Sequence, residues 1–166
     1  MTVLHNEAVC ELTLSRNIYL AATVAKFIGA MCTHVFSNPP LASRTVVAAL
    51  ELLENAIRYS VDGQSSIHVG FSRIGDGGRV VLLTKNRADG DRKVELTQFF
   101  DEMSMSTSRD AFYQTLLHRT MKRTEGSGLG LGRIHAEAEM DLSYQFEGDY
   151  VYLRAEANIP TLGGRL

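Results

Sequence analysis

Residues 125–134 read EGSGLGLGRI, with a glycine at every second position from 126 to 132. Glycine tolerates backbone angles that other residues avoid, and its N–H group can approach an anion closely. An apolar helical pattern follows directly, and the N-terminus of a helix carries partial positive charge. The stretch therefore predicts a phosphate-binding turn at the start of a helix. The alternative explanations are a flexible loop and a helix packed tightly on a sheet.

A second informative stretch is ELLENAIRYS, residues 51–60. Glu51 and Asn55 are four residues apart, so a helix places both side chains on one face. An asparagine amide oxygen is a neutral ligand suited to Mg²⁺, and a carboxylate one turn away can accept a proton. Two solvated side chains on an exposed helix are the simpler explanation of the same pair.

Composition limits the class of protein. The chain has 166 residues, 45% hydrophobic and 22% charged, which is enough for one globular domain with a sizeable core. Its 17 basic and 19 acidic side chains give a net charge of -2, so charge gives no reason to expect a nucleic acid or a membrane as partner. Cys10 and Cys32 make neither a disulfide framework nor a zinc site, and we expect both to be reduced.

The location of the protein is also predicted from the sequence. The N-terminus lacks the basic start and apolar run of a signal peptide, and no segment reads as about 18 continuous apolar residues. We therefore expect a cytoplasmic protein.

Hydrophobic periodicity predicts an α+β order of elements. Ser15 is the expected cap of the first helix, and Asn38-Pro39-Pro40 the expected stop. Alternation predicts strands at residues 9–14, 66–71, 79–84, 142–146 and 151–155, and 3.6-residue periodicity predicts helices at residues 15–31 and 41–59 and after the glycines. Residues 89–125 are more polar and contain two short helical stripes.

The two quoted stretches resemble the N-box and the last glycine box of the GHKL ATPase superfamily, which includes DNA gyrase, histidine kinases, MutL and bacterial anti-sigma-factor kinases. The resemblance covers residues 41–160 and includes a closing hairpin that ends in ANIP, residues 157–160. It implies a two-layer α/β sandwich of the Bergerat type, with a mixed, mostly antiparallel sheet, helices on one face and a long ATP lid.

The resemblance also divides the single domain, residues 1–166, into parts. These are an N-terminal strand and helix at 1–40, the N-box helix at 41–60, the lid at 90–125, and the glycine box, helix and closing hairpin at 126–160. A lid of this length is too long to be structureless in a compact domain, so we expect its two stripes to fold as helices.

The resemblance implies that the cofactors are ATP and Mg²⁺. Asn55 takes the position of the metal-binding asparagine, and Glu51 that of the catalytic carboxylate. Asn86 takes the position of the residue that accepts a hydrogen bond from adenine. The triphosphate-binding positions are Gly126, Ser127, Gly128, Leu129 and Gly130. Lys122 and Arg123 are either phosphate ligands or solvated charges at a helix end.

One motif departs from the family. The superfamily carries Asp-x-Gly-x-Gly after the second strand of the hairpin, where this chain has Asn86 and Ala88. An Asn side chain keeps a carbonyl oxygen but is neutral, and losing a glycine can close the pocket. Asp89 and Gly90 can take the place of the Asp and the first Gly of this motif if the alignment shifts by a few residues. If Lys85 or Arg87 fills the pocket, protein binding without nucleotide is favoured; if Asn86 lines it, a kinase is favoured.

The short N-terminal region is similar to that of free-standing serine/threonine kinases of partner-switching systems. The implied function is phosphorylation of a small antagonist protein, with an antagonist or a sigma-factor-like protein as partner. The alternative is a non-catalytic regulator of the same fold. A third possibility, phosphotransfer through His34, lacks the expected motif.

Three further features leave alternatives open. Residues 21–27 are a candidate face for homodimer formation. Residues 104–108, SMSTS, form either a phosphorylation site or a capped loop. The aromatic residues of the lid are either its core or a partner-binding patch; they are Phe99, Phe100, Phe112 and Tyr113.

Overall fold

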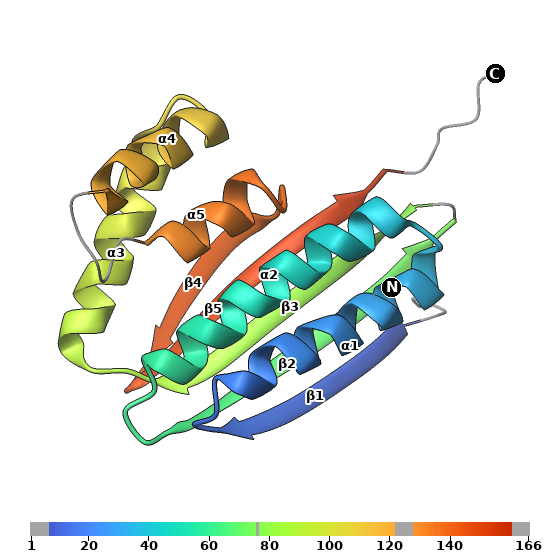
Figure 1. Ribbon diagram of the computed structural model, residues 1–166, viewed down its shortest axis with the longest axis horizontal. Helices are drawn as coiled ribbons and strands as arrows, with labels where there is room; N and C mark the ends of the chain where they lie inside the picture. Colours follow the sequence, from blue (N-terminus) through green and yellow to red (C-terminus); the bar gives the residue numbers. More distant parts are fainter. Residues whose placement is uncertain (1–6, 76, 122–127, 161–166) are drawn as a thin grey trace.

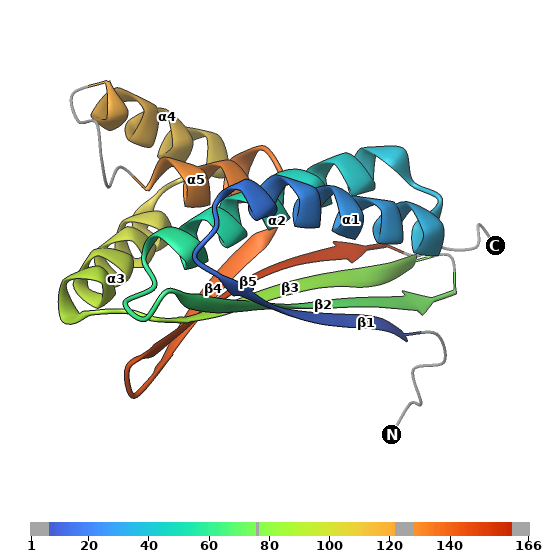
Figure 2. The same cartoon turned by 60° about the horizontal axis from the view of Figure 1, so that its bottom comes forward.

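The computed structural model describes residues 7–75, 77–121 and 128–160. The elements follow the order β1 (Glu7–Ser15), α1 (Tyr19–Phe36), α2 (Pro39–Arg58), β2 (Gln64–Ile74), β3 (Gly77–Arg87), α3 (Gly90–Met105), α4 (Arg109–Thr120), α5 (Leu129–Ala136), β4 (Asp141–Glu147) and β5 (Tyr150–Ile159). The strands form one five-stranded sheet in the order β1-β2-β3-β5-β4. The helices lie over one face of this sheet (Figure 1 and Figure 2), which confirms the predicted α+β sandwich.

Every strand pairing among the described residues is antiparallel, so the expectation of a mixed sheet was wrong. The hairpins β2–β3 and β4–β5 are antiparallel because short turns join their strands. Between β1 and β2 the chain passes through α1 and α2, which lie side by side (Figure 1). Three reversals of direction along this path leave β1 and β2 antiparallel as well.

The helix α2 lies along the middle of the helical layer. The side chain of Asn38 accepts a hydrogen bond from the Leu41 N–H group at 3.0 Å, and prolines occupy the first turn. Both features are typical of a helix start. Its apolar face is fully buried against the sheet, with Ala48, Leu52 and Leu53 at 0% exposure. Each such leucine contributes about 1.5–3 kcal/mol by leaving water.

The first helix begins later than predicted. β1 continues to Ser15, and the side chain of Asn17, not Ser15, accepts a hydrogen bond from the Tyr19 N–H group at 3.1 Å. By length and composition alone, α1 is apolar enough to span a membrane, contrary to expectation. It packs on α2 and β2 through five buried residues, which are Ala21, Ala25, Ile28, Gly29 and Cys32. Ala21 and Ala25 are fully buried and so not available for a dimer face, whereas Phe27 is half exposed.

The lid contains the two predicted helices. α3 is capped by Asp89 and α4 by Ser108, whose hydroxyl accepts a hydrogen bond from the Ala111 N–H group at 3.1 Å. Residues 104–108 therefore form the end of one helix and a capped connection to the next. The ring of Phe99 contacts the rings of Phe100 and Phe112 edge to face, and all three are buried, so these three residues belong to the core of the lid. Tyr113, the fourth aromatic residue of the prediction, is half-buried, and its hydroxyl donates to Glu137.

Candidate functional site

The helix α5, which follows the glycines, and the helix α2 meet at one site. Glu51 and Asn55 lie one turn apart near the end of α2, and α5 packs against this end. A Cβ atom built on Gly130 would lie 2.5 Å from Glu51 Oε2 and 3.4 Å from Asn55 Nδ2. A side chain at position 130 would displace the carboxylate of Glu51, so glycine permits this close approach. Gly130 is therefore brought together with two residues of α2 that lie far from it in the sequence.

Asn86 lines a pocket beside this site. It is 5% exposed, and its Nδ2 atom donates to the Arg87 carbonyl oxygen at 3.2 Å. The pocket is also lined by Tyr59, Ala88, Val151 and Leu153.

Lys85 and Arg87 lie on the opposite face of the sheet, because successive strand residues alternate. Arg87 pairs with Asp149 at 3.1 Å, and the Lys85 ammonium lies 4.2 Å from the centroid of the Tyr150 ring. Neither side chain fills the pocket, which is the arrangement that the sequence analysis associated with a kinase.

Arg92 of the lid occupies the pocket instead. Its guanidinium lies 3.6 Å above the centroid of the Tyr59 ring, and Nη2 donates to Asn55 Oδ1 at 3.2 Å. Its other terminal nitrogen pairs with Glu95 at 3.1 Å. The Arg92 side chain is 11% exposed, which is low for a group that is strongly stabilised by water.

With Arg92 in this position, the site does not fit an adenine nucleotide. The remaining space is about 10 Å³, room for a single water molecule and far too little for a purine. The oxygen of Asn55 that is suited to a metal accepts a hydrogen bond from Arg92, and the Asn55 Nδ2 atom donates to the Glu51 carbonyl oxygen at 2.8 Å. The described residues contain no cluster of three or more His, Cys, Asp or Glu side chains for a metal.

Glu51 belongs to a series of ion pairs and hydrogen bonds that extends to α4 of the lid. It is 9% exposed and forms an ion pair with Arg133 of α5. Arg133 also pairs with Glu137 at 3.2 Å, and Glu137 accepts a hydrogen bond from the Tyr113 hydroxyl of α4 at 2.5 Å. Burial raises the pKa of Glu51, an effect that Arg133 opposes. Burial and the bond to Glu137 raise the pKa of Tyr113 to about 12.

Glu51→Gln is expected to raise the melting temperature at pH 7. Because the pKa of Glu51 is raised, the native state holds this proton more tightly than the unfolded chain. The resulting stability is full below the ordinary glutamate pKa and is lost as the pH rises through the native value. The difference between variant and wild type should therefore narrow as the pH falls toward about 4.

Thermal unfolding followed by circular dichroism at several pH values checks this expectation. Glu54→Gln is the matched control, because Glu54 is half-buried on the same helix and is not paired with Arg133 in the structure. A melting temperature of Glu51→Gln that is lower than wild type at every pH would contradict the argument.

The remaining predicted site residues are distributed as follows. Lys122, Arg123, Gly126 and Ser127 lie outside the described residues. Gly128 is the N-cap of α5, with a left-handed φ of 69°. Leu129 begins α5 and packs against the hydrophobic core. His34 is exposed in the last turn of α1.

Sequence reasoning missed Arg92 and Arg133, which both contact the predicted site. Arg92 follows the Asp89 cap in a polar segment, and Arg133 lies directly after the glycine run. A basic residue within the glycine helix was the available signal for Arg133, because Glu51 needs a partner once it is buried. The position of Arg92 depends on how the lid folds back, for which the sequence gives no pattern.

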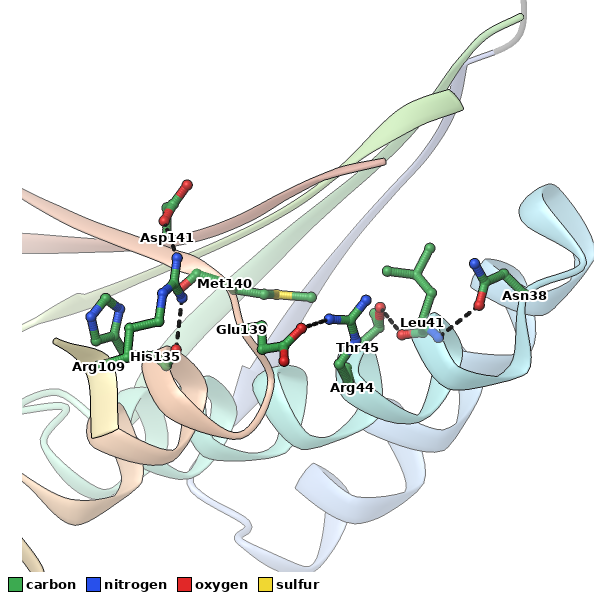
Figure 3. A network of polar contacts seen from close by, with 9 residues as sticks. All are labelled: Asn38, Leu41, Arg44, Thr45, Arg109, His135, Glu139, Met140 and Asp141. Carbon is green, nitrogen blue, oxygen red and sulfur yellow. Dashed lines mark hydrogen bonds and ion pairs between the residues drawn. The ribbon is translucent and has the colours of Figure 1, made fainter. Parts of the chain in front are cut away.

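A second hollow, of about 640 Å³, lies near the start of α2 and is lined partly by Arg44, Arg109, Glu139 and Asp141. Figure 3 shows that these charged groups face one another, with Arg44 paired with Glu139 and Arg109 paired with Asp141. Arg109 Nη1 also donates to the carbonyl oxygens of His135 at 2.7 Å and Met140 at 3.0 Å. Arg109 thus links the start of α4 to the connection between α5 and β4.

Arg109→Ala is expected to lower the free energy of unfolding by about 1 kcal/mol, because two carbonyl groups and one carboxylate lose a charged donor at a partly exposed position. Urea denaturation measures the loss. Arg119→Ala is the control, because Arg119 on the same helix has a similar exposure and pairs with Glu102 alone among the described carboxylates. Equal losses in both variants would show that the carbonyl contacts contribute nothing.

The fold has a counterpart among solved structures. The crystal structure of the SiaB–SiaC complex from Pseudomonas aeruginosa contains a chain that superposes with a TM-score of 0.61 at 15% sequence identity. The match covers 90% of the present chain and 89% of that chain. No family model and no curated protein sequence matches the chain. At this identity the likeness establishes the shared fold.

Proposed function

We propose that the chain is an ATP-binding regulatory protein of bacterial partner-switching signalling, built on a GHKL-type fold. The observation that carries this proposal is the convergence of Glu51, Asn55 and Gly130 beside a pocket lined by Asn86. These four positions come from α2, α5 and β3, and the family resemblance gives each of them a role at one nucleotide site. A coincidental resemblance gives no reason for them to meet.

In this proposal each residue has one task. Asn55 offers a neutral oxygen to Mg²⁺, and the main chain at Gly128 and Gly130 lies at the N-terminus of α5, where partial positive charge favours phosphate. Glu51 accepts the proton of a hydroxyl group on the partner. When bound, ATP would supply the γ-phosphoryl group that the hydroxyl oxygen takes up, with ADP as the leaving group. The protein therefore acts as a serine/threonine kinase.

The partner in this proposal is a small regulatory protein, of the antagonist or sigma-factor-like kind. The structural neighbour is a complex of two proteins, which supports a role in protein binding for this fold. The proposal places the protein in the cytoplasm, without a nucleic acid or a membrane as partner. The proposal also includes a homodimer that forms through the exposed part of α1 near Phe27.

A second candidate function is a non-catalytic regulator that binds its partner without using ATP. Two observations favour it: Arg92 fills the pocket, and Arg133 pairs with the carboxylate that would accept the proton. An ion pair lowers the basicity of a carboxylate and so weakens it as a general base.

Calorimetry with MgATP decides between the two functions. The wild-type chain is expected to bind with a heat that requires Mg²⁺, and Asn55→Ala is expected to bind about tenfold more weakly because the metal loses one oxygen ligand. Asn158→Ala is the matched control, since Asn158 is exposed near the far end of β5. If neither the folded wild-type chain nor a folded variant that lacks the Arg92 side chain binds MgATP, only the non-catalytic regulator remains.

A further inference from the structure

The position of Arg92 is unusual for an arginine on a lid helix. Its guanidinium stacks on Tyr59 and donates to Asn55, and 11% of its side chain is exposed. A guanidinium is stabilised by an aromatic face when it is removed from water, and a hydrogen bond from a charged donor is stronger than a neutral one. These contacts hold the first turns of α3 against α2.

Other contacts hold α3 in place without Arg92. The Lys93 ammonium donates to the Gly148 carbonyl oxygen at 2.7 Å, and at the other end of α3 the Phe100 ring stacks on Tyr144 with centroids 4.4 Å apart. The Arg92 side chain can therefore leave the pocket while α3 stays folded and docked. Departure of this one side chain frees the Asn55 oxygen and one face of the Tyr59 ring.

We propose that Arg92 is an internal competitor of MgATP. The inference rests on the proposed function, because it assumes that Asn55 holds the metal. Mg²⁺ and a guanidinium cannot both sit against Asn55 Oδ1 without strong repulsion between two cations. The base and the Arg92 side chain also require the same space beside Tyr59 and Asn86. Nucleotide binding and the closed state of Arg92 therefore exclude each other.

Such a competitor lowers the apparent affinity for MgATP. The apparent affinity is the intrinsic affinity multiplied by the fraction of molecules in which Arg92 has left the pocket. Loss of the stacking and of the charged hydrogen bond is expected to strengthen MgATP binding by about 10- to 100-fold. The direction of this change is diagnostic. If Arg92 instead attracted the negatively charged phosphates, its removal would weaken binding.

The test is calorimetry with MgATP on wild type, Arg92→Gln and Lys93→Gln. Glutamine keeps the helix propensity of α3 but loses the charge and the planar fork. Lys93→Gln removes the neighbouring charge, which lies outside the pocket. Binding by Arg92→Gln that is at least tenfold tighter than wild type, with Lys93→Gln unchanged or weaker, supports the proposal.

Equal or weaker binding by Arg92→Gln, with clear binding by wild type, overturns the competitor and leaves the proposed ATP site intact. No binding by either folded protein overturns both. The NMR signal of the Arg92 guanidinium gives an independent readout. Rotation of this group is expected to be restricted in the free protein, where it stacks on Tyr59 and donates to Asn55, and to be fast in wild type saturated with MgATP. Restricted rotation in both states would also overturn the competitor.

Discussion

Gly128→Val is expected to lower the free energy of unfolding by about 3 kcal/mol. Gly128 has a φ of 69°, a left-handed conformation that costs a residue with a side chain about 1–2 kcal/mol. A Cβ atom at this position would also lie 2.8 Å from Cδ2 of Phe99, a buried ring of the lid core. Overpacking of this kind costs about 1–3 kcal/mol. Urea denaturation followed by circular dichroism measures the sum.

Gly148→Val separates the two contributions. Gly148 has a φ of 56° in the turn between β4 and β5, and a Cβ atom there would meet nothing within 4 Å. This control therefore carries the backbone strain without the contact with Phe99. A larger loss in Gly128→Val is the expected result. Losses of the same size would mean that the lid core adapts freely at position 128.

Hydrophobic periodicity predicted the elements of the fold because most of them bury one face. Alternation along residues 66–71 and 79–84 identified β2 and β3, although the strands extend to Gln64–Ile74 and Gly77–Arg87. Apart from Ile74, the missing ends are polar or glycine residues that pair through backbone hydrogen bonds, which leave no pattern in side chains. The two stripes of the lid were found for the same reason, because Phe99 and Phe112 face each other.

The candidate site could be predicted where the chemistry depends on residue type and spacing. Glu51 and Asn55 share a helix face, and Gly128 tolerates the left-handed conformation that begins α5. The closed state of the site could not be predicted, because it depends on Arg92, whose contacts with Asn55 and Tyr59 cross from the lid to another helix. Those contacts follow from tertiary packing, which no local pattern records.

Arg133→Met is expected to lower the free energy of unfolding by about 2 kcal/mol at pH 7. Methionine keeps much of the apolar stem but leaves the carboxylate of Glu51, whose side chain is 12% exposed, without its cation. Removing one partner of a buried pair costs about 3–5 kcal/mol, and the cost is smaller here because Arg133 is 38% exposed. The pKa of Glu51, which burial already raises, should rise further.

A double-mutant cycle with Glu51→Gln tests whether the ion pair is the cause. In the Glu51→Gln background, Arg133→Met should cost less than about 1 kcal/mol, because the neutral side chain needs no cation. The cost in the wild-type background should also fall as the pH is lowered and Glu51 becomes protonated. An unchanged cost in both backgrounds would show that Arg133 acts through packing or through Glu137. If the coupling is found, Arg133 is the group that keeps Glu51 ionised inside the protein, and the same ion pair lowers the basicity of this carboxylate.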